Sequence, residues 1–76
     1  MPTIAKIGGL KVQVYPDDHL PKHFHISGPG FQVVVAMSDL SILKGRRYRR
    51  EVEPAIEWAS RNLELLSTEW DRQNVR

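Results

Sequence analysis

The sequence predicts a single α+β domain over residues 1–76, in which an antiparallel sheet of four or five strands precedes a C-terminal helix or helix pair packed on one face. A chain of 76 residues is too short for a second domain. Up to about residue 44, apolar residues alternate with polar ones between turn-forming residues, which is typical of strands. Beyond residue 48 the apolar period becomes helical.

The N-terminal segment predicts a β-hairpin. The runs TIAKI (Thr3–Ile7) and LKVQVY (residues 10–15) are separated by Gly8 and Gly9, a typical two-residue hairpin connection. Alternate residues of the second run are apolar and the others polar, so this strand has one buried face and one solvated face. Pro16 removes a backbone donor, and we expect the chain to leave the sheet there.

Two or three further strands follow. HFHIS (residues 23–27) returns to the sheet, and FQVVVAM (residues 31–37) is apolar on both faces, which predicts a central strand covered on both sides. LSILK (residues 40–44) is either a last short strand or the approach to the helix.

The C-terminal third predicts helix, because one apolar stripe recurs at intervals of three and four residues. The stripe consists of Val52, Ile56, Ala59, Leu63, Leu66 and Trp70. Proline is tolerated only near a helix start, so Pro54 favours a regular helix from Arg50 or Glu51. The run SRN (residues 60–62) is a candidate break between two helices, and the alternative is one unusually long helix.

Trp58 lies off this stripe if the helix is continuous. It would then be exposed, as an anchor for a partner interface. A break after Asn62 is the alternative, and it would allow both Trp58 and Trp70 to join the core.

The net charge is +2, but the charged residues are distributed unevenly along the chain. Five cations gather before the helix, at Lys44, Arg46, Arg47, Arg49 and Arg50. With Tyr48 among them, they predict a surface that holds phosphates while the tyrosine stacks on a base. The alternative is a solvated loop, and the overall charge is too small to identify a nucleic-acid-binding protein by itself.

Composition narrows the function further. The chain has no cysteine, which excludes disulfides and thiol chemistry, and its thin core favours a partner protein or a homo-oligomer. We expect a cytoplasmic protein without membrane contact, because no apolar run reaches the length of a membrane span. Metalloprotease and nucleotide-triphosphatase motifs are absent from the sequence.

The run DDHLPKHFHIS (residues 17–27) contains all three histidines. His23 and His25 are two residues apart, so in a strand they share one face while Phe24 and Ile26 point into the core. One functional interpretation is acid–base catalysis of the metal-independent ribonuclease type. It uses His23, His25 and His19 as catalytic groups and Asp18 as the orienting carboxylate.

Two other interpretations of this run stay open. His23, His25, His19 and Asp18 could bind a metal ion, but two certain ligands do not make a site, so we expect neither metal nor cofactor. The simplest interpretation is structural: Asp17 and Asp18 shape a turn, and the histidines lie on the solvated face of a strand. Spacing alone favours this last interpretation.

Four segments together resemble a known family. They are MPTI at residues 1–4, the pattern Asp-His-x-Pro-x-His-Phe-His at residues 18–25, KGRRYRR at residues 44–50 and AIEWASRNLELLSTEW at residues 55–70. In order and spacing they resemble domain-of-unknown-function family 4160 of small bacterial proteins. The likeness places the family's characteristic residues on Asp18, His19, Pro21, His23, Phe24, His25, Trp58 and Trp70. Lys22, where many relatives have a second proline, and Pro54 depart from the pattern.

The resemblance implies one half of a two-gene module, encoded beside a small protein of domain-of-unknown-function family 2442. Such modules resemble type II toxin–antitoxin systems. We therefore expect a toxin–antitoxin component that binds this small cognate protein, with the toxin as the favoured role. We expect it to act on RNA through the histidines, while the arginines bind phosphate. The alternatives are a non-enzymatic protein-binding module with structural histidines and a small metal-binding protein.

Overall fold

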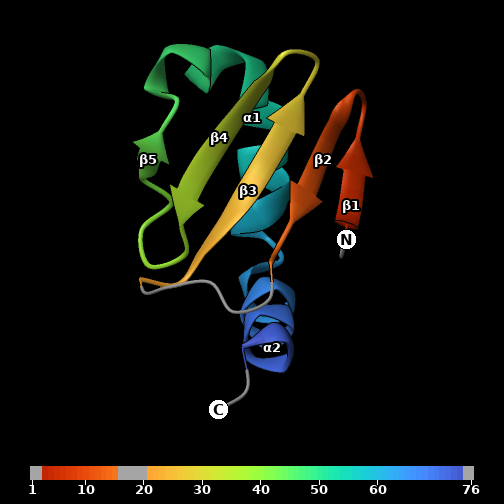
Figure 1. Ribbon diagram of the computed structural model, residues 1–76, viewed down its shortest axis with the longest axis vertical. Helices are drawn as coiled ribbons and strands as arrows, with labels where there is room; N and C mark the ends of the chain where they lie inside the picture. Colours follow the sequence, from red (N-terminus) through yellow and green to blue (C-terminus); the bar gives the residue numbers. More distant parts are fainter. Residues whose placement is uncertain (1–2, 16–20, 75–76) are drawn as a thin grey trace.

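A computed structural model describes residues 3–15 and 21–74 and shows a five-stranded antiparallel sheet followed by two helices (Figure 1). The α+β class and the placement of the strands before the helices are confirmed. The elements are β1 (Thr3–Ile7), β2 (Leu10–Gln13), β3 (His23–Gly28), β4 (Phe31–Ala36), β5 (Ile42–Lys44), the 3-10 turn η1 (Arg46–Tyr48), α1 (Arg49–Ser60) and α2 (Leu63–Gln73).

The strands lie side by side in the order of the sequence, β1-β2-β3-β4-β5, and every neighbouring pair is antiparallel. The centre of the sheet is therefore β3, and the prediction that residues 31–37 form the central strand is wrong. The apolar residues of β4 divide between its two faces. Val33 and Val35 are buried in the core, whereas Val34 is only half-buried on the other face. The unbroken apolar run of β4 therefore does not mean that helices cover both faces of this strand.

The core lies between one face of the sheet and α1, which runs behind the strands in Figure 1. Its buried members are Leu10, Val12, Val14, Phe24, Ile26, Val33, Val35, Met37, Val52, Ala55, Ala59, Leu66 and Trp70. Helix α2 continues past the end of the sheet, and in the described part of the chain neither helix covers the front of the strands (Figure 1). The predicted one-sided packing is confirmed. Within residues 3–15 and 21–74, no helix is long and apolar enough to span a membrane.

The predicted break between two helices is present, and Asn62 forms it. The Asn62 side-chain amide donates to the Trp58 carbonyl at 2.8 Å, and its backbone N–H donates to the Ala59 carbonyl at 3.0 Å. These bonds satisfy carbonyls that the end of α1 leaves without helical partners. The change of direction lets both tryptophans pack: Trp70 is buried, and Trp58 is partly buried against the core.

Helix α1 begins earlier than the sequence predicted, at Arg49, so Pro54 lies in its second turn. A proline there cannot donate to the carbonyl of the residue four positions earlier, which is Arg50. Pro54 is exposed, on the side of α1 away from the sheet, where water can reach that carbonyl. The helix therefore continues through the proline.

Two stacked aromatic side chains attach the connection between β5 and α1 to the sheet. Phe31 stacks on Tyr48 with ring centroids 4.5 Å apart and planes inclined by 13°. On β3, a Cβ at Gly28 would overlap the Phe31 ring, so the glycine makes room for it. Gly45, with φ 85°, turns the chain from β5 into η1 beside β4. We call residues 44–50, fixed in this way, the arginine turn.

Asp39 adds a side-chain hydrogen bond to the β4–β5 turn, which a backbone hydrogen bond between Ala36 and Ser41 closes. The Ser41 N–H donates to Asp39 Oδ1 at 3.0 Å. Hydrogen bonds from the Ser41 hydroxyl and then from its backbone N–H lower the pKa of the Asp39 carboxyl. A lowered pKa means that this contribution to stability is present at neutral pH and is lost as the pH falls through the lowered value.

We predict that Gly45→Ala destabilises the protein by about 1–3 kcal/mol, because a left-handed backbone costs a side chain about 1–2 kcal/mol and the new Cβ also crowds its neighbours. That Cβ would lie 2.8 Å from the Gln32 carbonyl oxygen. Gly9→Ala is the matched control, since a Cβ there meets nothing within 4 Å and Gly9 has no positive φ. Urea denaturation measures both, and equal stability losses would contradict the prediction.

Candidate functional site

His23 is a packed residue at the start of β3. It is 4% exposed, and its Nδ1–H donates to the Pro21 carbonyl at 2.7 Å. Its ring meets Trp70 of α2 and His25 of the same strand edge-on, each at a centroid distance of 5.1 Å. A side chain held in this way has almost no surface left to offer a substrate.

The predicted side-chain directions along β3 are confirmed in part. Phe24 and Ile26 are fully buried in the core, and His23 and His25 share the opposite face, as the alternation requires. The prediction that His23 lies on a solvated surface is wrong, because Trp70 packs against it. No local pattern in the sequence indicates that α2 reaches this end of the sheet.

His25 occupies the middle of the side of the sheet that neither described helix covers. It is half-buried, lies directly opposite Gln13 of β2 and Val34 of β4, and meets the Tyr15 ring edge-on at 4.5 Å. Its predicted partners Asp17, Asp18 and His19 lie outside the described residues. The proposed acid–base group and the His–Asp metal set therefore stay predictions, and no group of three potential metal ligands occurs within residues 3–15 and 21–74.

A hydrogen-bonded polar layer surrounds His25. Gln13 Oε1 accepts from the Ser27 hydroxyl at 2.9 Å and from the Tyr15 hydroxyl at 3.1 Å. Gln32 Nε2 lies 3.5 Å from both hydroxyl oxygens. These bonds hold polar side chains of β2, β3 and β4, and Tyr15 just beyond β2, in one arrangement.

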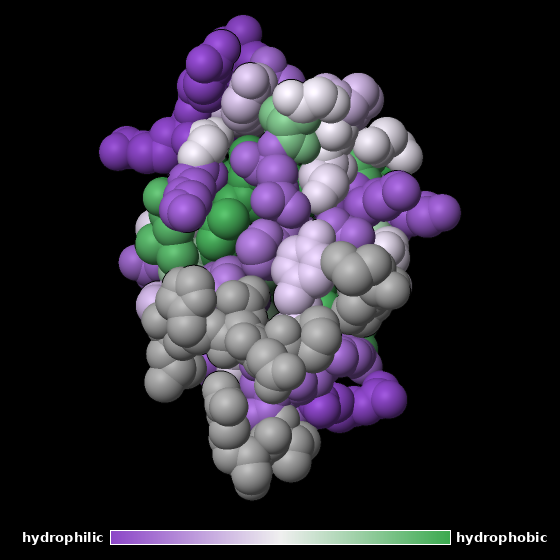
Figure 2. All heavy atoms as spheres, in the orientation of Figure 1, coloured by the Kyte–Doolittle hydropathy of each residue, from purple (hydrophilic) through white to green (hydrophobic). Residues whose placement is uncertain are grey.

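We call this uncovered side of the sheet the open face. Its described residues are Thr3, Lys6, Lys11, Gln13, Tyr15, His25, Ser27, Gln32, Val34 and Lys44. Figure 2, seen from this side, shows hydrophilic side chains through the middle of the sheet and apolar ones gathered towards β4 and β5. Gln13, Ser27 and Gln32 were not among the predicted site residues, although their alternation with buried residues is visible in the sequence.

The open face is also basic. The five strands carry three lysines, Lys6, Lys11 and Lys44, and no acidic residue. All three lysines are exposed. Lys6 and Lys11 lie directly opposite each other, and Lys44 lies opposite Val34 in the same row as His25. The described acidic residues lie in the β4–β5 turn and on the two helices.

The arginine turn does not converge with the histidines. Arg46 and Arg47 lie in η1, while Arg49 and Arg50 begin α1 behind the sheet (Figure 1). Of the predicted phosphate-binding residues, only Lys44 shares a row with His25. Tyr48 is half-buried, with one face of its ring covered by Phe31 and the Arg47 guanidinium carbon 5.1 Å from its centroid. A base could stack on this ring only by displacing the Arg47 guanidinium, because Phe31 covers the other face.

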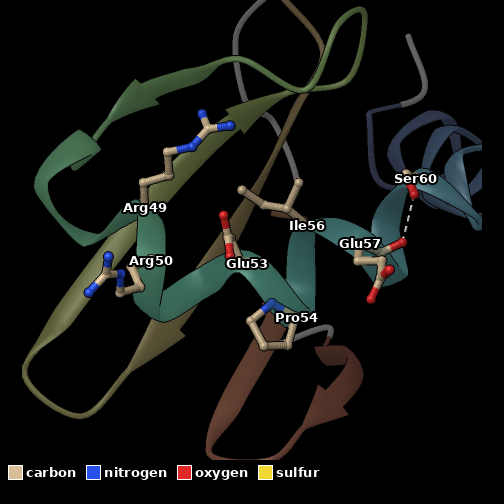
Figure 3. Close-up of a pocket in the computed structure, with 7 residues that line it drawn as sticks. All are labelled: Arg49, Arg50, Glu53, Pro54, Ile56, Glu57 and Ser60. Carbon is tan, nitrogen blue, oxygen red and sulfur yellow. Dashed lines mark hydrogen bonds between the residues drawn. The ribbon is translucent and has the colours of Figure 1, made fainter.

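Two surface hollows in the described part of the chain lie elsewhere. One, of about 560 Å³, follows the outer side of α1 and carries both signs of charge (Figure 3). Its lining residues are Arg49, Arg50, Glu53, Pro54, Ile56, Glu57 and Ser60.

The other, of about 320 Å³, lies between α2 and the sheet end near Met37 and Leu63. At its rim, Lys22 Nζ donates to the Ser67 hydroxyl at 2.6 Å and pairs with Asp71 at 3.3 Å. Among the described residues, neither hollow is lined by a histidine, so neither extends the predicted acid–base group.

We predict that the two described histidines differ in their effect on stability. His23→Ala should cost about 2–3 kcal/mol, because it leaves a cavity beside Trp70 and removes a buried hydrogen bond. His25→Ala should cost less than about 1 kcal/mol, since half-buried side chains lose less on truncation. Urea denaturation of both variants checks this, and equal losses would show that His23 is not the structural member of the pair.

The comparisons with known proteins give one family match. Neither the search of curated proteins nor the search of solved structures finds a match. The family model described as "Domain of unknown function (DUF4160)" matches residues 9–71, which include the described strands from β2 onwards, the arginine turn and both tryptophans. The chain therefore belongs to the DUF4160 family.

Proposed function

We propose that this protein is the binding component of a two-protein module of the toxin–antitoxin type, and that its small cognate protein docks on the open face. The observation that carries the proposal is the uncovered face itself, where an ordered polar layer is displayed beside basic residues. A partner of domain-of-unknown-function family 2442, encoded by the adjacent gene, is the one that the family resemblance suggests.

The arrangement of this face suits binding. Gln13, Tyr15 and Ser27 are held in place by one another before any partner arrives, so little side-chain freedom is lost on association. Val34, which is half-buried, adds apolar area beside the polar layer. Interfaces commonly combine an apolar part with a hydrogen-bonding rim.

The burial of His23 favours a binding role for this protein over a catalytic one. A general base must come within hydrogen-bonding reach of its substrate, and His23 is buried against Trp70. We assign His23 a structural role and His25 a place in the interface. Among the alternatives that the sequence left open, this corresponds to a non-enzymatic module with structural histidines.

Action on RNA is the second candidate, and the arginine turn is the observation that favours it. Its five cations are all exposed, and the stack of Tyr48 on Phe31 holds the turn that carries them against the sheet. Cations beside a helix start oppose the helix macrodipole, so local helix stability does not account for them. Growth arrest on expressing this gene alone, relieved by the adjacent gene, would support a toxin role; arrest that survives combined His23→Ala and His25→Ala substitution would remove both residues from the mechanism.

For the first candidate, we predict that Gln32→Trp weakens binding of the co-encoded protein at least about ten-fold, or by about 1.4 kcal/mol, because it places a bulky ring in the middle of the open face. Gln32 is exposed, so the fold should tolerate the change. Ser60→Trp on the outer side of α1 is the control and should bind like the wild type. Calorimetry gives both affinities; an unaffected Gln32→Trp variant would exclude this face as the interface.

For the second candidate, we predict that combined Arg46→Ala and Arg47→Ala substitution weakens binding of single-stranded RNA. The slope of log affinity against log salt should become shallower by about 0.7 for each phosphate that the variant no longer neutralises. Arg61→Ala, at an exposed arginine beyond the end of α1, is the control. Fluorescence anisotropy over a salt series measures the slope. If all variants share one slope, the arginine turn does not bind RNA.

A further inference from the structure

We propose that the partner presents carboxylates to the open face, and that at least one of them lies between Lys6 and Lys11. This inference rests on the proposed function, because it takes the open face to be the docking surface. It goes further by giving the chemistry of the partner, which is an acidic protein segment.

Lys6 and Lys11 repel each other in the unbound protein. They are direct cross-strand neighbours in β1 and β2, and like charges in that arrangement destabilise a sheet. No carboxylate among the described residues pairs with either of them. An approaching carboxylate would therefore turn two repelling charges into two attractive contacts.

The row in which this pair lies is rich in hydrogen-bond donors. Lys6, Lys11, Ser27 and Gln32 are successive cross-strand neighbours over four strands. The two lysines can donate hydrogen bonds through their ammonium groups and Gln32 through its amide, while the Ser27 hydroxyl already donates to Gln13 Oε1. Carboxylate oxygens only accept, so an acidic segment lying across the strands is complementary to the lysines and to Gln32.

The cations of the open face are lysines, and this favours carboxylates over phosphates as the anions that bind there. Lys44 adds a third cation one row further along, beside Val34 and His25. The described residues of this face include no arginine, which is the residue whose planar fork best matches phosphate. The arginine turn lies elsewhere, so a nucleic acid has a better site there. The mixture of lysines, neutral donors and Val34 suits an acidic protein surface.

A short polyglutamate peptide tests the inference without the cognate protein. In two-dimensional NMR spectra of the isotope-labelled protein at low ionic strength, the peptide should shift the backbone signals of Lys6, Lys11, Ser27 and Gln32. Lys11→Glu should reduce peptide affinity at least about ten-fold. Arg50→Glu makes the same change of charge on α1 and should reduce it less than about three-fold. A short single-stranded RNA in place of the peptide should shift signals of the arginine turn instead.

The inference fails if the polyglutamate shifts centre on the arginine turn, if RNA shifts the open face as strongly as polyglutamate does, or if the two charge reversals weaken the peptide equally. A second measurement guards against misfolding: Lys11→Glu faces Lys6, so its melting temperature should equal or exceed that of the wild type. A clear fall in melting temperature would contradict the repulsion on which the inference rests.

The co-encoded protein then separates this inference from the proposed function. If the wild type binds it but Lys11→Glu binds equally well, the docking function stands and the acidic chemistry is wrong. If the wild type does not bind it while polyglutamate still maps to the open face, the cognate pairing is wrong and the preference of the face for carboxylates stands.

Discussion

The packing of α1 against the rear of the sheet is the contact on which the rest of the structure depends. Val52, Ala55 and Ala59 are fully buried there, and the two alanines let the helix backbone approach the strands closely. Helix α1 lies over the rear of the strands, and α2 extends past their end, where its Trp70 packs against His23 (Figure 1). Neither described helix therefore covers the front of the sheet, and the open face is a direct result of this arrangement.

Much of the fold follows from local sequence patterns. Gly8 and Gly9 predicted the first hairpin, the alternation around Val12 predicted which residues point inwards, and the helical stripe predicted the side of the helices that packs. These features follow from strand and helix periods and from turn chemistry, which short stretches of sequence contain. The possible break at residues 60–62 was also visible, although only the bonds made by Asn62 decide it.

The sequence could not predict features that depend on distant segments. The burial of His23 requires Trp70, which belongs to the last helix, and the place of β4 in the sheet depends on whether residues 42–44 pair with it. In the candidate site, the spacing of His23 and His25 correctly predicted a shared face but not their unequal exposure. The polar layer around Gln13 could not be predicted, because glutamine and serine carry no recognisable motif and only cross-strand pairing brings them together.

The sequential order of the strands affects how the chain folds. Every sheet pairing joins strands that are neighbours along the chain, so the pairings are local in sequence. The core is not local, because α1 follows all five strands and must pack back over their rear face. A chain whose strands had paired before α1 packed would expose Val12, Ile26 and Val35 to water. Such a species would be prone to aggregate, so docking of α1 is the step that protects the apolar side of the sheet.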